Sequence, residues 1–441
     1  MKKYDVIVIG AGPAGYPAAI RAAQLEASVA VVEKNELGGV CLNKGCIPTK
    51  SLIHAANLYE EINQGKKMGI EANPKIDLAK LILWKDSVIK RLGLGILSLF
   101  KSYGIELIKG SAFLKTPEMI EINGQEEIKA KKIIIATGSS SFIPKGFEID
   151  HRRFITSDDV LSNFFIPKDI AIIGGGAIGC EFACLFNKLG AKVSVYEMME
   201  HLLPGESLDV GEYLENSFKK RGIEVFTNRK INLSELSTEK VLISIGRKPN
   251  SENLGLKEIG IEMNEKGFVT INERAETNVP GIYAAGDITG KGLLAYLATY
   301  QGVIAAENSR GKEEKINYSL IPSCIFTDPE IGTIGKREEG SLVGRFPFLA
   351  LGKSYAENRS EGFIKVIAEK ESEKIVGGQI VGEKATELIA IITTAIRAKM
   401  NIDEFSQVIY GHPTFSEGIK EAILDLKKKA IHLPKSSSAN Q

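Results

Sequence analysis

Two cysteines separated by four residues are the first groups in this 441-residue chain that could carry chemistry. Cys41 and Cys46 stand in the stretch Cys-Leu-Asn-Lys-Gly-Cys-Ile-Pro-Thr-Lys, which covers residues 41–50. A regular helix would raise the second cysteine about 7.5 Å above the first, whereas the Cα atoms of a disulfide usually lie within about 6.8 Å of each other. A bridge between them would therefore need a distorted turn, and Gly45 supplies the backbone freedom for one.

The position of Cys46 favours a reactive thiol. An amphipathic helix can begin near Gly45, and a helix N-terminus stabilises a thiolate, which makes it a better nucleophile and leaving group. Two alternatives stay open at this point: the cysteines could be unbridged core residues, or they could bind a metal. The metal interpretation is disfavoured because no second Cys/His pair with ligand spacing follows. We expect no metal site, and we interpret Cys180, Cys184 and Cys324 as core residues.

The segment before the cysteine loop has the pattern of a nucleotide-binding unit. An apolar run over 4–9 leads into Gly10, Gly12 and Gly15, and an alanine-rich amphipathic stretch then leads to a second apolar run that ends at Glu33. This order predicts a strand, a glycine turn, a helix and a second strand that ends at an acidic residue. In that context the glycines let the backbone approach a pyrophosphate at the helix N-terminus, and Glu33 can accept a hydrogen bond from a ribose hydroxyl.

The same pattern returns about 165 residues later, as expected for a second unit of this kind. A buried strand precedes Gly174, Gly176 and Gly179, and the strand predicted over 192–196 is followed by Glu197. Two such motifs imply two dinucleotide sites in separate Rossmann-like domains. A single glycine-rich turn can lack a ligand, but two empty turns of this form are less expected.

Other strand ends are expected to meet these sites. One apolar run ends at the small-residue turn Thr137-Gly138, another ends at Gly246, and a third ends at Asp287, where a cofactor's polar chain could meet the carboxylate. After about residue 320 the pattern changes to antiparallel strands followed by helical stretches, which predicts a third, α+β domain.

Composition excludes several other classes of protein. Lys and Arg number 56 against 55 Asp and Glu, so no global field attracts nucleic acid or an anionic membrane. The N-terminal apolar run breaks at Gly10, which favours a buried strand over a targeting segment or a membrane span. Five cysteines are too few for a secreted disulfide scaffold, so we expect a cytoplasmic location. The C-terminal stretch, from Lys427-Lys428-Lys429 through Pro434 to the serines at 436–438, is expected to be a fraying helix end followed by a disordered tail.

Together these motifs resemble those of the FAD-dependent pyridine nucleotide-disulfide oxidoreductases. The resemblance spans about residues 4–425 and rests on the cysteine loop, both glycine motifs, Thr-Asp-Pro-Glu at 327–330 and His-Pro-Thr-Phe-Ser-Glu at 412–417. The cysteine loop is most similar to that of members that oxidise protein-bound dihydrolipoamide to lipoamide with NAD⁺. The resemblance implies an α/β fold with two Rossmann-like dinucleotide-binding domains plus a C-terminal α+β interface domain. The implied bounds are 1–145 for an FAD-binding domain, 146–264 for an NAD-binding domain, 265–319 for a return to the FAD-binding or central domain, and 320–441 for a dimerisation domain.

The resemblance also implies roles for the residues. FAD would be held at the first site and NAD at the second, with hydride passing between NAD and the flavin, and electrons passing between the flavin and a Cys41–Cys46 disulfide. Cys46 would be the flavin-proximal, charge-transfer sulfur, and Cys41 the sulfur that exchanges with lipoamide. His412, oriented by Glu417, would take the substrate thiol's proton, a task that suits an imidazole with a pKa of about 6.5.

Further contacts follow from the same resemblance. Lys50 resembles a lysine near the flavin ring, and Glu181 resembles an acid that contacts nicotinamide. With these two, the expected cofactor-binding residues are Gly10, Gly12, Gly15, Glu33, Thr137, Gly138, Asp287, Gly174, Gly176, Gly179, Glu197 and Gly246. The remaining histidines match no catalytic position, and we interpret them as structural or exposed: His54, His151, His201 and His432.

The implied partners are a second copy of the chain and lipoamide on a lipoyl-domain acyltransferase, from a 2-oxo acid dehydrogenase complex or a glycine cleavage system. Glutathione-type and mercuric reductases are alternatives. Glutathione-type reductases are expected to use NADP and to bind its 2′-phosphate with arginines, but here Met198 and Met199 follow Glu197. Mercuric reductases typically carry extra C-terminal cysteines, and in this sequence no cysteine follows Cys324. A catalytically impaired flavoprotein scaffold is a further alternative.

The chain departs from the family pattern in four places. Only about ten residues separate Arg229 from the apolar segment at Val241, where relatives carry more strand, and the stretch 335–344 is short where relatives carry a helix. Tyr296 and Tyr410 stand where many relatives have histidine. Tyrosine can donate a hydrogen bond but cannot replace a base that acts at neutral pH.

Overall fold

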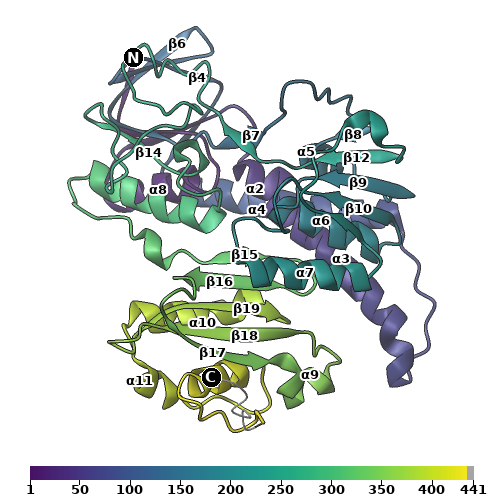
Figure 1. Cartoon of the computed structure of the whole chain (residues 1–441). Helices are drawn as coiled ribbons and strands as arrows, with labels where there is room; N and C mark the ends of the chain where they lie inside the picture. Colours follow the sequence, from purple (N-terminus) through teal and green to yellow (C-terminus); the bar gives the residue numbers. More distant parts are fainter. Residues whose placement is uncertain (435–441) are drawn as a thin grey trace. The chain divides into compact units, whose positions relative to one another are not determined.

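Seven strands form the first sheet of the computed structural model, which describes residues 1–434 (Figure 1). The strand order is β3-β2-β1-β6-β5-β4, and β14 also pairs with β6. The central strands are parallel, with Val8 opposite Val31 on one side and Ile134 on the other. The C-terminal ends of β1 and β6, residues 6–9 and 133–135, are apolar and buried because both faces of the sheet are covered there. Their bounds are β1 Lys2–Ile9, β2 Val29–Glu33, β3 Glu106–Lys109, β4 Ala112–Thr116, β5 Met119–Ile122, β6 Glu126–Ile135 and β14 Ile282–Ala284.

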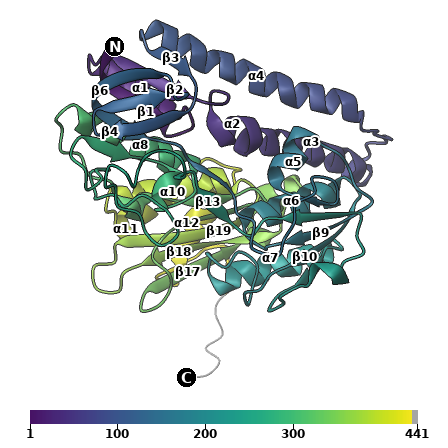
Figure 2. The ribbon, with the colours of Figure 1, turned by 90° about the horizontal axis from the view of Figure 1, so that it is seen from above.

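Helices pack against this sheet through small residues. The buried positions of α1 are Gly15, Ala18, Ala19 and Ala22, a spacing that places them on one helix face. A Cβ atom at Gly302 of α8 would lie 2.2 Å from the Ala14 carbonyl oxygen, so glycine is required where α8 meets the chain before α1. Figure 2 shows α3 and α4 running alongside each other. The helices of this part of the chain, including those that do not contact the sheet, are α1 Gly15–Gln24, α2 Gly39–Lys44, α3 Cys46–Gln64, η1 Gly65–Met68, α4 Leu78–Ser102, α5 Ser157–Ser162, η3 Asp287–Thr289 and α8 Ala295–Ser309.

A second sheet has five strands in the order β11-β10-β9-β12-β8. Parallel pairing joins β10 to β11 and β12 to β8, as expected for a Rossmann-like unit. Between β11 and β12 the described chain forms only the short helix η2, in agreement with the short connection noted in the sequence. The elements are β8 Phe154–Ile155, β9 Asp169–Ile173, α6 Ala177–Lys188, β10 Lys192–Tyr196, α7 Leu208–Lys220, β11 Glu224–Phe226, η2 Leu233–Glu235 and β12 Lys240–Ile243.

The C-terminal sheet is antiparallel, in the order β15-β16-β19-β18-β17. Its strands are β15 Ser323–Ile325, β16 Ile331–Gly335, β17 Leu342–Pro347, β18 Gly362–Ala368 and β19 Ile375–Gly382, with η4 Tyr318–Leu320, η5 Phe348–Ala350, α9 Gly352–Ala356, α10 Ala385–Arg397, α11 Ile402–Ser406 and α12 Glu417–Asp425 around them. Residues 336–341 contain no helix, in agreement with the short stretch noted in the sequence. Within them, Glu338 forms an ion pair with the fully buried Lys365. Of the three cysteines interpreted as core residues, Cys180 is fully buried and Cys184 almost fully buried. Cys324 is half-buried and packs against the hydrophobic core of the C-terminal domain.

The chain divides into two units. The first contains Met1–Ile170, Lys188–Ala191 and Ser237–Ile316, and the second contains Ala171–Asn187, Lys192–Leu236 and the chain from Asn317 onward. The predicted α/β class with a C-terminal α+β region is confirmed, and the four domain bounds stay predictions. Of the C-terminal stretch expected to fray, residues 427–434 follow the end of α12 at Asp425 and are hydrogen-bonded back to it, whereas the serines at 436–438 lie outside the described residues. Within residues 1–434, no helix has both the length and the apolar character needed to cross a membrane.

Candidate active site

The cysteine loop consists of two helices that meet at one glycine. Helix α2 ends at Lys44 and α3 begins at Cys46, so only Gly45 separates them. A Cβ atom at Gly45 would lie 2.9 Å from the Val40 carbonyl oxygen and 3.2 Å from the Cα atom of Cys41. These contacts are closer than a side chain tolerates, so the chain can turn here because residue 45 has no side chain.

This break brings the two cysteine side chains together. Cys41 and Cys46 are hydrogen-bonded to each other, and both are half-buried. That hydrogen bond, together with burial, raises the pKa of the Cys41 thiol, while the charge of Lys50 opposes the rise. Cys46 is the first residue of the 19-residue helix α3, where the sequence predicts a helix start. Two thiols in contact, one of them at a helix N-terminus, can form and open a disulfide.

The first glycine turn leaves a helix start open to a ligand. Gly10 has a φ of +99°, and a Cβ atom there would lie 2.4 Å from the Ala136 carbonyl oxygen. A Cβ atom at Gly15 would lie 1.8 Å from the Gly10 carbonyl oxygen, whereas one at Gly12 would meet only the Cα atom of Gly39, at 3.7 Å. No side chain caps α1, and its first two N–H groups, those of Gly15 and Tyr16, donate to the Gly12 carbonyl oxygen at 2.9 and 3.1 Å. The turn is thus held by its own backbone, and the lack of a side chain at Gly12 leaves room for the pyrophosphate of FAD to approach the positive end of the helix.

The same turn lies against the start of the cysteine loop. Gly39 has a φ of +58°, and a Cβ atom there would lie 2.7 Å from the Cα atom of Gly12. The Gly38 N–H donates to the Ala11 carbonyl oxygen at 2.9 Å. Close backbone approach at these glycines places the cysteine loop beside the turn expected to hold FAD.

Glu33 holds the first turn with both carboxylate oxygens. Its Oε2 accepts the Ala11 N–H at 2.7 Å, and its Oε1 accepts the Asn35 N–H at 2.7 Å. The side chain is buried at the end of β2. Each carboxylate oxygen can accept a second hydrogen bond, so a ribose hydroxyl fits the same group.

Glu197 repeats this arrangement in the second unit. Its Oε2 accepts the Gly175 N–H at 2.7 Å, and its Oε1 accepts the Met199 N–H at 2.8 Å. Gly174 has a φ of +105°, and a Cβ atom at Gly176 would meet nothing within 4 Å. The second turn is therefore also open where a pyrophosphate would approach.

Helix α6, which follows this turn, carries the buried residues Gly179 and Glu181. Glu181 Oε1 accepts the Phe326 N–H at 3.0 Å, and the Cys184 sulfur accepts the Asp328 N–H at 3.3 Å. The Thr-Asp-Pro-Glu segment noted in the sequence is thereby attached to α6. At least one carboxylate oxygen of Glu181 therefore already accepts a hydrogen bond from the protein backbone.

Thr137, Gly138 and Gly246 lie in one crossing of two chain segments. The Thr137 hydroxyl donates to the Asn250 carbonyl oxygen at 2.9 Å, and the Asn250 side-chain amide donates to the Thr137 carbonyl oxygen at 2.9 Å. The Asn250 N–H donates to the Gly138 carbonyl oxygen, and the Phe142 N–H donates to that of Gly246. The crossing continues as an antiparallel pair of strands, β7 Ser139–Ser141 and β13 Arg247–Pro249.

Asp287 is held by the same two strands. The Ser139 hydroxyl donates to Asp287 Oδ2 at 2.5 Å, and Arg247 Nε donates to the Ser139 hydroxyl at 2.7 Å while lying 3.9 Å from the carboxylate. Burial raises the pKa of Asp287, although the Ser139 hydrogen bond and the Arg247 charge oppose the rise.

His412 and Glu417 form a pair at the start of α12, in the second unit. His412 Nδ1 lies 2.9 Å from Glu417 Oε1, and Glu417 Oε2 accepts the Thr414 N–H at 2.8 Å. Burial opposes ionisation of Glu417, but the Thr414 and His412 hydrogen bonds outweigh it and lower the pKa of this carboxyl. The His412 side chain is 78% exposed. A carboxylate on Nδ1 orients the ring and leaves Nε2 to act on a substrate.

The structure thus gathers the expected residues into separate groups. The cysteine loop with Lys50, the first turn, and the Thr137 crossing with Asp287 belong to the first unit, while the second turn and His412–Glu417 belong to the second. Sequence reasoning missed Asn250, Ser139 and Arg247. The sequence could have indicated them, because each lies within a few residues of an expected cofactor contact.

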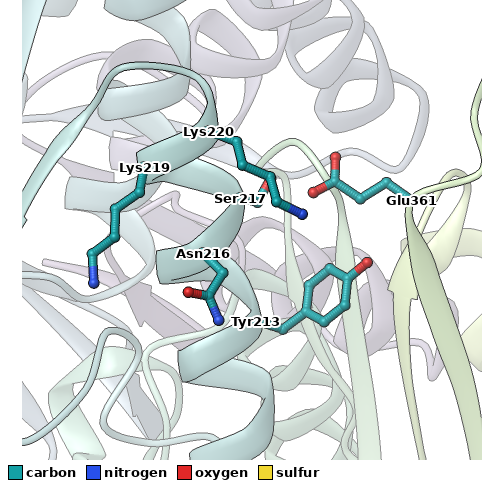
Figure 3. A pocket seen from close by; sticks show the side chains of 6 residues that line it. All are labelled: Tyr213, Asn216, Ser217, Lys219, Lys220 and Glu361. Carbon is teal, nitrogen blue, oxygen red and sulfur yellow. The ribbon is translucent and has the colours of Figure 1, made fainter.

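A surface cavity of about 380 Å³ lies elsewhere in the second unit (Figure 3). It is lined by residues of α7 and by the residue before β18: Tyr213, Asn216, Ser217, Lys219, Lys220 and Glu361. None of the expected site residues lines it.

Comparison with known proteins places these features in one family. The sequence model of the pyridine nucleotide-disulphide oxidoreductases matches residues 4–302, and that of their dimerisation domain matches residues 321–423. Dihydrolipoyl dehydrogenase from Thermus scotoductus is 39% identical, with 98% of this chain and 99% of the relative covered. Dihydrolipoyl dehydrogenase from Geobacillus stearothermophilus is 37% identical, with 97% of each covered.

Two solved structures have the same fold over nearly the whole chain. The crystal structure of LpdA from Mycobacterium tuberculosis has a TM-score of 0.88 at 26% identity and covers 96% of this chain and 99% of that one. The HOCl-induced flavoprotein disulfide reductase RclA from Escherichia coli has a TM-score of 0.86 at 25% identity, with 96% and 100% covered. The matches show an oxidoreductase that uses FAD and NAD(H), and the contact between Cys41 and Cys46 fits its redox-active pair. The chain belongs to the pyridine nucleotide-disulphide oxidoreductase family.

Proposed function

We propose that this protein oxidises protein-bound dihydrolipoamide to lipoamide with NAD⁺. The observation that carries the proposal is the contact between Cys41 and Cys46 across the helix break at Gly45, beside the first glycine turn. Oxidation of a dithiol substrate needs an acceptor dithiol–disulfide pair whose sulfur atoms can meet, and this loop provides one. The full-length similarity to dihydrolipoyl dehydrogenases supports the choice of substrate.

The first glycine turn would hold the FAD pyrophosphate at the start of α1, and the second turn would hold that of NAD. When bound, the two cofactors supply hydride transfer between nicotinamide and flavin. The chain's own part is to present a disulfide: Cys41 exchanges with the substrate sulfur, and Cys46 stays at the start of α3. Lys50 places a positive charge that favours the Cys41 thiolate. Glu181 would support the nicotinamide side, and Asp287 with Thr137 would support the FAD side.

His412 would accept the proton of the substrate thiol through Nε2, with Glu417 holding Nδ1. The dimerisation-domain match supports a homodimer. Within that dimer we propose that His412 serves the disulfide of the partner subunit, so that each active site combines two chains.

The basic test is NAD⁺ reduction by dihydrolipoamide, measured at 340 nm, beside NADH oxidation by ferricyanide. Cys41→Ser is expected to lose the first activity and keep the second, because an artificial acceptor takes electrons without the disulfide. A wild-type protein that reduces ferricyanide but never uses dihydrolipoamide would instead support the impaired scaffold.

Mixed dimers test the shared site. Cys41→Ser and His412→Gln homodimers are each expected to be nearly inactive with dihydrolipoamide. A doubly tagged heterodimer would restore one complete site, so up to about half of the wild-type activity is expected from the two-fold symmetry. If the purified heterodimer is as inactive as its parents, the assignment of His412 to the partner's disulfide is wrong.

Two finer points complete the proposal. We expect preference for NAD over NADP, because the Glu197 carboxylate would repel a 2′-phosphate; equal use of both cofactors would contradict this. We also propose a cytoplasmic location, and as partner a lipoyl-domain acyltransferase of a 2-oxo acid dehydrogenase complex or the glycine cleavage system.

A further inference from the structure

Helix α12 carries a second glutamate one turn after Glu417. Glu421 follows it by four residues, and residues at this spacing lie on the same face of a helix. The Glu421 side chain is only 10% exposed. A carboxylate buried to this degree needs hydrogen-bond partners from the protein.

Glu421 repeats the arrangement seen at Glu417. Its Oε1 lies 3.1 Å from His432 Nδ1, and its Oε2 accepts the Ile431 N–H at 2.9 Å and the His432 N–H at 3.0 Å. In both pairs one oxygen holds an imidazole Nδ1 and the other accepts backbone N–H groups. The sequence alone placed His432 among structural or exposed residues, and its side chain is indeed 68% exposed, but its Nδ1 is bound.

These bonds fasten residues 426–434, which we name the C-terminal strap, back onto α12. Leu433 of the strap packs against the C-terminal hydrophobic core. Lys427 forms ion pairs with Glu373 and Asp403, each at 2.8 Å. The start of the strap also continues from α12 through backbone hydrogen bonds to carbonyl oxygens of its last turn, such as Lys427 N–H to Leu424. Of these bonds between the strap and α12, the ones to Glu421 lie nearest to Glu417 along the helix.

The strap also acts on Glu417 by charge. Burial and the Thr414 and His412 hydrogen bonds have the largest effects on the pKa of Glu417, and the charge of His432 adds to its lowering. That contribution is the smallest of those named and requires a protonated His432, and no direct bond between the two pairs is found within residues 1–434.

We propose that Glu421 and His432 are positioning residues for His412. By closing the strap, they fix the first turns of α12 and with them the direction in which Glu417 holds the His412 ring. Without the His432 ring, Oε1 of this buried carboxylate would lose its partner and only Oε2 would keep its two backbone N–H donors, so α12 would have to move to bring Oε1 to another donor or to water. A movement of about 1 Å at a catalytic group can lower a rate about 100-fold. The inference rests on the proposed function, in which His412 is the base for the dithiol step.

The test compares two replacements of His432. In His432→Asn the amide nitrogen takes the place of Nδ1 and keeps the bond to Glu421, whereas in His432→Gln the amide lies near the place of Nε2. We expect His432→Gln to lower kcat for dihydrolipoamide about ten-fold with KM changed less than about two-fold. His432→Asn is expected to keep at least about half of kcat, because the hydrogen bond that orients the strap remains.

The matched control is His151→Gln. His151 forms another exposed pair, with Asp159 at 2.8 Å, in the first unit. This variant is expected to keep both activities. NADH oxidation by ferricyanide is expected to stay unchanged in every variant, because it uses neither the cysteines nor His412.

The outcomes separate the two claims. If the wild-type protein never uses dihydrolipoamide, the proposed function fails and this inference fails with it. If the wild-type protein is active and His432→Gln matches it, the inference alone is overturned. It is also overturned if His432→Asn and His432→Gln lose both activities equally, because the strap would then only support the fold.

Discussion

A Gly45→Ala variant is expected to lose dithiol chemistry while keeping nucleotide chemistry. The new methyl group would lie 2.9 Å from the Val40 carbonyl oxygen and 3.2 Å from the Cα atom of Cys41. Both neighbours are backbone atoms, so the contact can be relieved only by moving the end of α2 away from the start of α3. That movement changes the distance between the sulfur atoms of Cys41 and Cys46.

The size of the effect follows from these contacts. Forcing an extra methyl group into a packed site costs about 1–3 kcal/mol. Alanine also restricts the unfolded chain, which offsets about 0.4–1 kcal/mol of that loss. We therefore expect the free energy of unfolding to fall by roughly 1–2 kcal/mol, and dihydrolipoamide turnover to fall at least about ten-fold because reacting groups tolerate little displacement.

The assay measures urea unfolding, dihydrolipoamide-dependent NAD⁺ reduction and ferricyanide reduction on the same preparation. Gly95→Ala is the matched control, because Gly95 lies inside helix α4 and a Cβ atom there would meet nothing within 4 Å. That control is expected to gain about 0.5–1 kcal/mol of stability from helix propensity and to keep both activities. A Gly45→Ala protein with wild-type dihydrolipoamide turnover would refute the steric argument.

Three further predictions concern stability. Glu197→Ala leaves the buried N–H of Gly175 and the part-buried N–H of Met199 without their acceptor, so the free energy of unfolding is expected to fall by roughly 2 kcal/mol, and a loss below about 1 kcal/mol in urea unfolding would contradict this. Tyr410 has a buried hydroxyl that finds no partner among residues 1–434, and burial raises its pKa to about 12. Tyr410→Phe is therefore expected to be neutral or to stabilise by up to about 1 kcal/mol, whereas a clear loss of stability would show that the hydroxyl has a partner. Because the folded-state pKa of Glu417 lies below its ordinary 4.5, its ionised form stabilises the fold above that pH, and this contribution is lost as pH falls through the folded-state pKa. The stability difference between wild type and Glu417→Gln should thus shrink between neutral and acidic pH, and a constant difference would argue against it.

Much of the fold follows from local patterns in the sequence. The strand predicted over 192–196 is observed with those bounds, because a run of apolar residues in a buried strand is a property of neighbouring positions. The helix start near Gly45 and the two glycine turns were predictable for a similar reason. They depend on backbone freedom at particular residues and on short spacings, which the chain encodes without reference to distant parts.

The candidate site was predictable where a motif names its residues, as with His412 and Glu417, and less so where its residues come from separate segments. Ser139 and Arg247 meet Asp287 only because two strands pair across more than one hundred residues of chain. That pairing leaves no periodic or local signal. The double hydrogen bonds of Glu33 and Glu197, in contrast, recur at the same spacings in the two repeated units that the sequence predicts.

The contrast is clearest on α12. The sequence by itself determined that a histidine and a glutamate stand five residues apart, and the resemblance of the 412–417 motif to that of the family implied that they act together. Only the tertiary structure decided that Glu421 faces a strap ten residues later and that His432 closes it. A buried carboxylate binds whichever donors the folded chain brings to it, and that choice is made by packing over long distances, which spacing along the chain does not record.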